Sequence, residues 1–140
     1  MSGLSASLAG LILLASCGTP SPSAPPAPPA TAGEQITLAP GQSAQVQGGS
    51  VRIIFQSVSA DSRCPVDVTC VWEGDAVVVI TTLAEGDTAF RHELHTSGRY
   101  ASEVEVSTAR IRLVSLAPEP HADQPPAPAA YRATLLVTQR

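Results

Sequence analysis

The stretch that decides the fold class is residues 77–82, VVVITT, near the middle of the 140-residue chain. Positions 77, 79 and 81 alternate with positions 78, 80 and 82, and both sets are largely apolar. A strand with two apolar faces is buried on both sides, as a central strand is. We therefore expect residues 77–82 to form the centre of a sheet.

The segments on either side of this run repeat their apolar residues with a period of two rather than 3.6. Val51, Ile53 and Phe55 form one apolar face, with Arg52 and Gln56 on the other. Further sets that share a face are Phe90, His92 and Leu94; Ile111 and Leu113; and Tyr131, Ala133, Leu135 and Val137. Turn residues separate these segments at Pro40-Gly41, Gly48-Gly49, Glu85-Gly86-Asp87, Ser97-Gly98 and Pro118. The sequence predicts an all-β fold, a single antiparallel β-sandwich of about seven to eight strands.

The N-terminal motif Leu14-Ala15-Ser16-Cys17 resembles the lipobox of bacterial lipoproteins. It closes the apolar run Leu8–Ala15, which is too short to span a bilayer and ends in small residues, as a secretory signal does. No Lys or Arg precedes the run, which departs from the usual signal peptide. The resemblance implies that residues 1–16 are a signal peptide, that Cys17 carries acyl chains such as palmitate, and that the protein is anchored by lipid to a membrane of the bacterial cell envelope.

Gly18, rather than an aspartate, follows the cysteine. Among lipoproteins this favours the outer membrane where the organism has one. Residues 18–33 are nearly all Pro, Ala, Ser and Thr, and such a segment favours an extended spacer that reaches roughly 50 Å. Residues 17–33 are thus predicted to be a lipidated cysteine and a Pro/Ala-rich tether, and residues 34–140 a single folded domain.

The charge of the chain disfavours nucleic acid as a partner. The net charge is −4, and the eight basic residues, all arginines, form no cluster. Nucleic-acid binding requires a positive surface that neutralises phosphates, so we do not expect it.

The densest local signal is residues 61–76, DSRCPVDVTCVWEGDA. With Cys17 lipidated, Cys64 and Cys70 are the remaining thiols, and they would face an oxidising compartment. We expect them to form a disulfide that staples the loop between the strands containing Phe55 and Val77. Closing so short a loop stabilises the fold by roughly 2 kcal/mol.

Residues 61–76, together with Leu94-His95-Thr96, Leu113–Pro118 and Tyr131, resemble a group of small, uncharacterised bacterial secreted proteins and lipoproteins. These look like single β-domains that carry an aspartate-serine-arginine-cysteine-proline loop, a second cysteine and a tryptophan-x-glycine. The resemblance covers most of residues 34–140. It implies a fold and brings no activity.

Three interpretations of the loop compete. In the first it is a structural staple, with Trp72 plugging one end of the sandwich and Arg63 paired to Asp61 or Asp75. In the second it is a binding surface, with candidate residues Asp61, Arg63, Asp67, Trp72, Glu73 and Asp75.

The third interpretation is a metal site, either zinc at Cys64, Cys70, His92 and His95 or calcium at Asp61, Asp67, Glu73 and Asp75. A disulfide would remove the cysteines, and two histidines three apart on a strand face opposite sides. The alternating acidic pattern of an EF-hand is also absent. We therefore assign no metal ligands and no cofactor.

Catalytic motifs are also missing. Residues 41–45, GQSAQ, lack the last glycine of a nucleophile elbow, and His92, His95 and His121 sit in no catalytic motif. A second candidate surface is the proline-rich segment Pro118–Ala130. The sequence favours a non-enzymatic envelope lipoprotein, a structural or binding module that presents the disulfide loop to an envelope protein or cell-wall partner. The alternative is a metal-binding or metal-sensing envelope module.

Overall fold

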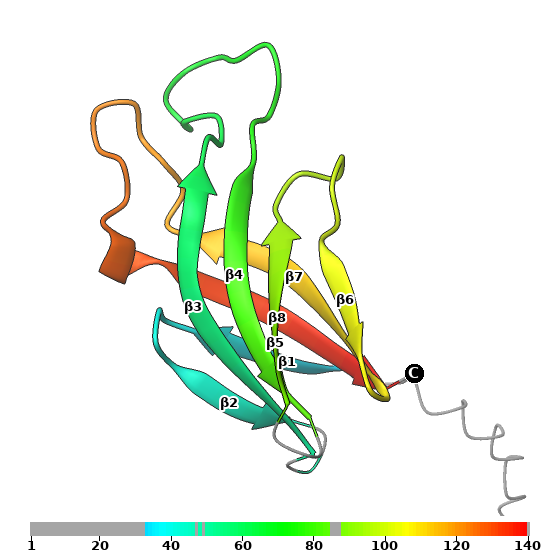
Figure 1. Cartoon of the computed structure of the whole chain (residues 1–140). Coiled ribbons are helices and arrows are strands. Elements are labelled where there is room, and N and C mark those ends of the chain that lie inside the picture. Colours follow the sequence, from blue (N-terminus) through cyan, green and yellow to red (C-terminus); the bar gives the residue numbers. More distant parts are fainter. Residues whose placement is uncertain (1–32, 47, 49, 85–87, 140) are drawn as a thin grey trace, which may run out of the picture.

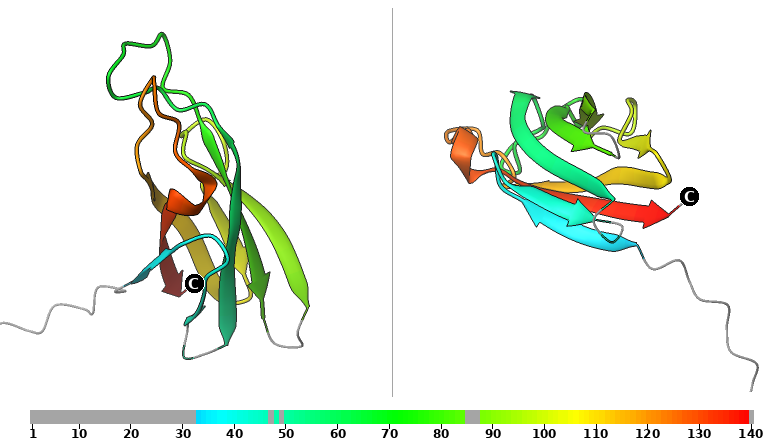
Figure 2. Two further views of the ribbon diagram at one scale, coloured as in Figure 1. Left: turned by 90° about the vertical axis from the view of Figure 1, so that its left-hand side faces the viewer. Right: turned by 60° about the horizontal axis from the view of Figure 1, so that its bottom comes forward.

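Eight strands form two four-stranded antiparallel sheets that pack face to face (Figures 1 and 2). The structure is a computed structural model that describes residues 33–46, 48, 50–84 and 88–139. The strands are β1 (Glu34–Leu38), β2 (Ser43–Val46), β3 (Val51–Asp61), β4 (Ala76–Leu83), β5 (Ala89–His95), β6 (Glu103–Val106), β7 (Ala109–Ala117) and β8 (Arg132–Gln139). A short 3-10 helix, η2 (Pro128–Ala130), precedes β8. The predicted all-β sandwich is confirmed.

The N-terminal predictions fall outside the described residues. They comprise the signal peptide at 1–16, the lipidated Cys17 and nearly all of the tether. They remain predictions.

The topology is a simple meander. One sheet has the order β2-β3-β4-β5 and the other β1-β8-β7-β6. The chain changes sheet between β1 and β2 and again between β5 and β6, and β1 pairs with β8. Short turns join β2 to β3, β4 to β5 and β6 to β7, whereas long loops join β3 to β4 and β7 to β8.

The period of two in the sequence builds the core between the sheets. In β3, Val51, Ile53 and Phe55 are fully buried, and β7 and β8 bury alternate residues in the same way. In β4, Val78, Val79 and Ile80 are all buried, as expected for a strand that lies between β3 and β5. The central position of residues 77–82 is confirmed.

Edge strand β5 departs from the predicted pattern. Phe90, His92 and Leu94 share one face, but only Leu94 is buried, while Phe90 is 54% exposed. Because β5 is the outer strand of its sheet, its first half is not covered by the facing sheet. Phe90 instead lines an open recess of about 270 Å³ together with Ala84 and Val106.

The two ends of the sandwich differ. At one end Glu34 pairs with Val137, so the start of the described domain lies beside its C-terminal strand. At the other end, the loop between Asp61 and Ala76 projects beyond β3 and β4 (top of Figure 1). The segment after β7 lies next to this loop (Figure 2, left). The loop is therefore far from the point where the N-terminal segment joins the domain.

Candidate functional site

The disulfide loop has a narrow base, here called the loop stem, which comprises residues 61–64 and 73–76. The stem prolongs the β3–β4 pairing, because Ser62 N donates to Asp75 O at 2.7 Å and Cys64 N donates to Glu73 O at 2.8 Å. Gly74 lies in the left-handed region with φ of 73°. A Cβ at this position would overlap the carbonyl oxygen of Ser62, so only glycine allows the two strands of the stem to approach.

The rest of the loop, residues 65–72, is here called the loop tip. Cys64 and Cys70 are joined by a disulfide with a Cα–Cα distance of 6.0 Å, which confirms the predicted pairing. The bond closes most of the tip into a small ring directly above the stem.

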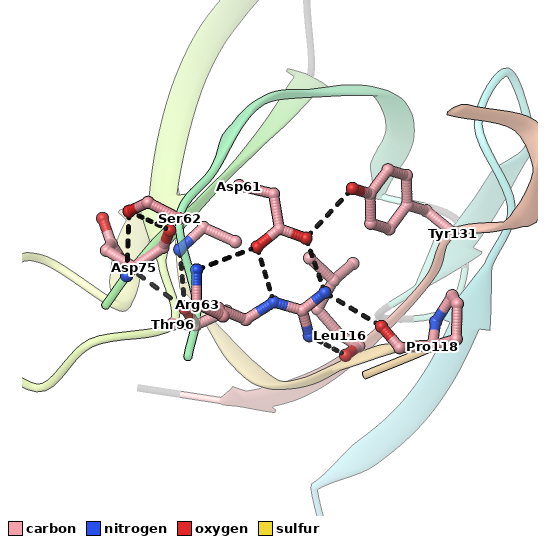
Figure 3. Close-up of polar contacts among 9 residues, drawn as sticks. Asp61, Ser62, Arg63, Asp75, Thr96, Leu116, Pro118 and Tyr131 are labelled. Atoms are coloured by element: carbon pink, nitrogen blue, oxygen red, sulfur yellow. Dashed lines mark hydrogen bonds and ion pairs between the residues drawn. The ribbon is translucent and has the colours of Figure 1, made fainter. Parts of the chain in front are cut away.

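Arg63 connects the stem to the other sheet (Figure 3). Its Nε and Nη2 donate to the two carboxylate oxygens of Asp61 at 2.9 and 2.7 Å. Nη1 donates to Leu116 O at 2.7 Å and Nη2 to Pro118 O at 2.9 Å. The Arg63 and Asp61 side chains are only 13% and 10% exposed. The predicted pairing of Arg63 is thus with Asp61, and it ties the end of β3 to the end of β7.

Tyr131 completes this cluster, because its hydroxyl donates to Asp61 Oδ2 at 3.0 Å. Burial by itself would raise the pKa of Asp61, but the hydrogen bonds from Arg63 and Tyr131 outweigh it and hold the pKa below its usual range. Burial, followed by the contact with Asp61, raises the pKa of Tyr131. Asp61 is therefore ionised and Tyr131 neutral at neutral pH.

Asp75 fastens the second strand of the stem. Its Oδ2 lies 2.6 Å from His95 Nδ1, and its Oδ1 accepts from Ser97 N at 2.9 Å and from the Thr96 hydroxyl at 3.3 Å. Burial would raise the pKa of Asp75, but the hydrogen bonds with His95 and Ser97 outweigh it and lower the pKa. The Ser97 hydroxyl donates in turn to Glu73 Oε1 at 2.7 Å. The charged groups of the stem are thus occupied by internal contacts.

The loop tip has the opposite character. Val66 and Val68 are about half exposed, Val71 is fully exposed and Trp72 is 42% exposed. The guanidinium of Arg99 lies over the Trp72 ring, 5.6 Å from its centroid. The prediction that Trp72 plugs the sandwich is wrong. The loop continues to Asp75 before β4 begins, so Trp72 lies outside any strand and away from the core.

The tip contacts loops on both sides. Val66 N donates to Pro120 O at 3.0 Å, and Ala122 N donates to Asp67 Oδ1 at 2.9 Å, which joins the tip to the segment after β7. On the other side the Trp72–Arg99 contact joins it to the loop between β5 and β6. We call residues 65–73, 97–102 and 118–123 together the apical surface.

A hollow of about 290 Å³ separates the stem from Glu119 and Pro120. Its walls include Arg63, Glu73 and Thr96. Because the Arg63 guanidinium is already bound to Asp61 and two carbonyl oxygens, it forms a wall of the hollow rather than a free cationic group.

The two proposed metal-ligand sets are not assembled. Cys64 and Cys70 are consumed by the disulfide, while His92 bonds Thr82 and His95 bonds Asp75. Each acid of the calcium set has its own protein partner: Asp61 with Arg63, Asp67 with Ala122, Glu73 with Ser97 and Asp75 with His95. Among the described residues, no three His, Cys, Asp or Glu side chains are close enough together to hold a metal ion.

Sequence reasoning missed several partners of the stem. Tyr131 was expected only in the core face of β8, and the carbonyls of Leu116 and Pro118 carry no side-chain signal. The family resemblance carried a signal for these partners. It includes Leu94–Thr96, Leu113–Pro118 and Tyr131, and each of these segments contributes a contact to the stem.

No family model, curated protein or solved structure matches this chain. Within the part of the chain that the structure describes, none of the helices has the length and apolar character needed to cross a membrane.

Proposed function

We propose that this protein is a non-enzymatic, lipid-anchored lipoprotein of the bacterial cell envelope whose apical surface binds an envelope protein or cell-wall partner. The observation that carries the proposal is the separation of roles within the disulfide loop. Its charged side chains hold the stem, while its apolar side chains are exposed at the tip.

Two features support a binding role. Adjacent exposed apolar side chains are unfavourable in water and commonly mark an interaction site. The tip is also held in one conformation by a disulfide, a glycine-dependent stem and hydrogen bonds to a neighbouring loop. A preformed surface loses less conformational entropy on binding, which favours affinity.

The non-enzymatic part rests on the local chemistry around the His95–Asp75 pair. Such a pair activates a serine only when the hydroxyl is bonded to the free imidazole nitrogen. The nearest serine in sequence, Ser97, instead donates its hydroxyl to Glu73. This arrangement favours a structural role for His95.

The anchoring part is tested at Cys17. Replacing Cys17 with Ser removes the sulfur that lipidation requires, so we expect an unlipidated precursor that is not cleaved before residue 17. Detergent-phase partitioning and intact mass measure this. A Cys17→Ser protein that is still cleaved and lipid-modified would exclude the lipoprotein assignment.

The binding part is tested by a photoreactive amino acid at Val71, in the full chain produced in its native host. The matched control is the same amino acid at Val114, an exposed apolar position on β7. We expect a discrete crosslinked species from position 71 and none from position 114. Identical patterns from both positions, or no crosslink from either, would reject the apical surface as a binding site.

A further inference from the structure

Exposed apolar side chains gather at one end of the molecule. Among the described residues, five of the seven large apolar side chains that are exposed lie in the apical surface: Val66, Val68, Val71, Trp72 and Tyr100. The other two, Phe90 and Val114, lie apart on β5 and β7. Trp, Tyr and Arg are the residues that most often dominate binding energy at protein interfaces. Here Arg99 lies over the Trp72 ring, and Tyr100 is the next residue after Arg99.

The charges around these side chains have mainly one sign. Four carboxylates of the apical surface are exposed, Asp67, Glu73, Glu119 and Asp123, whereas Arg99 is its one exposed arginine. The more deeply placed carboxylates, Asp61 and Asp75, are already paired within the stem. The apical surface therefore combines exposed apolar side chains with an excess of exposed carboxylates.

We infer that the apical surface binds a protein segment that carries exposed apolar side chains flanked by lysine or arginine. This inference rests on the proposed function and specifies the partner. The apolar residues of the segment would cover Val71 and Trp72, and its basic residues would face Glu73, Glu119 and Asp123. Complementary charges accelerate association and select the partner, while the buried apolar contacts supply most of the affinity.

The charges also disfavour two other occupants. A second copy of the chain would bring the same exposed carboxylates against those of the first. A membrane surface rich in anionic lipids would repel these carboxylates in the same way.

The test is a selection of random phage-displayed peptides on the full-length protein in detergent, with counter-selection on a Val71→Ser/Trp72→Ala variant. We expect the tip-dependent peptides to be enriched in Lys or Arg next to aromatic or aliphatic residues. A selected peptide should bind at least about 30-fold more weakly to the counter-selection variant. It should bind about tenfold more weakly to Glu119→Gln/Asp123→Asn, and added salt should weaken binding to the wild type.

Matched controls lie outside the apical surface. Val114→Ser removes a half-exposed valine on β7, and Glu93→Gln removes an exposed carboxylate on β5. Neither should change peptide binding by more than about twofold, because both lie beyond contact range of the segment.

Three outcomes overturn the inference. Tip-dependent peptides without excess Lys or Arg, or with affinity that is unaffected by Glu119→Gln/Asp123→Asn, would leave the proposed binding function standing and reject only this partner class. Tip-dependent dimerisation in sedimentation, or tip-dependent pelleting of the Cys17→Ser chain with phosphatidylcholine vesicles, would assign the surface to a second copy or to lipid. The absence of any tip-dependent peptide would reject this partner class, whereas the proposed binding function stands or falls with the crosslink from position 71.

Discussion

The stem and the tip of the disulfide loop reverse the usual partition of side chains. In the stem, charged residues such as Asp61, Arg63 and Asp75 are largely buried and paired. In the tip, Val66, Val68, Val71 and Trp72 face solvent. The comparison shows that the residues that look most functional in the sequence, the acids and the arginine, serve mainly to position the loop. The apolar residues between them remain exposed, and these are the residues that we propose contact a partner.

The same contrast predicts where substitutions act. Changes in the stem and in the disulfide should alter the stability of the domain, and changes to the exposed apolar side chains of the tip should alter binding without altering stability.

The largest expected effect is that of Arg63→Ala. It leaves the Asp61 carboxylate in a mostly buried site without its cation and frees the carbonyls of Leu116 and Pro118. We expect a loss of about 3 kcal/mol in unfolding free energy, measured by denaturant titration. As a control, Arg91→Ala breaks the exposed ion pair with Glu93 and should change stability by less than about 1 kcal/mol. Equal effects of the two substitutions would show that the cluster around Arg63 does not hold the sheets together.

Gly74→Ala should follow. It introduces a side chain at positive φ and also forces the two strands of the stem apart, so we expect a loss of more than about 2 kcal/mol. Gly41→Ala is the matched control, because Gly41 has φ of 81° but open space around its Cα. It should cost only the backbone strain, about 1 kcal/mol. The difference in melting temperature between the Gly74→Ala and Gly41→Ala variants measures the cost of the overlap with the stem backbone. Equal melting temperatures would contradict the close approach of the two strands.

Reduction of the Cys64–Cys70 disulfide should lower the unfolding free energy by roughly 2 kcal/mol, because it releases a short closed loop. Thiol titration of the folded protein should find that neither Cys64 nor Cys70 is free. Trp72 emission should shift little, since the ring is already partly in water. Two titratable thiols in protein taken from an oxidising compartment would show that the Cys64–Cys70 disulfide does not form.

Tyr131→Phe has a smaller expected effect of about 1.5 kcal/mol, the loss of one hydrogen bond to a charged group. It should also raise the pKa of Asp61 toward its unfolded value. Because the native pKa is lowered, Asp61 contributes full stability above about pH 4 and loses it as the pH falls through the native pKa. The acid-induced loss of stability should therefore be shallower in Tyr131→Phe. Carboxyl NMR titration of Asp61 checks the shift, and an unchanged pKa would contradict the contact.

Val71→Ser should have the smallest effect on stability, within about 0.5 kcal/mol, because the side chain is fully exposed. Thermal unfolding measures it. A large destabilisation would mean that the tip, like the stem, is a structural element, and the distinction between the two regions would fail.

The sequence by itself determined the fold class and the cross-link. The period of two in Val51–Phe55 and Tyr131–Val137 identifies strands, since side chains on a strand alternate between its two faces. The spacing of Cys64 and Cys70 identifies the disulfide, since residues six positions apart in one loop meet without help from the rest of the chain.

The tertiary structure alone decided which loop residues face inward. The partners of Asp61 and Arg63 lie in β7, in the segment that follows it and just before β8, 53 to 70 positions away, and their proximity depends on how the two sheets pack. Local sequence gives no measure of such packing, so one interpretation placed Trp72 at the end of the sandwich core and another counted both Trp72 and Arg63 among the candidate binding residues. Burial of a polar group depends on finding its hydrogen-bond partners, and in this protein those partners are supplied by the opposite sheet and by the loop between β5 and β6.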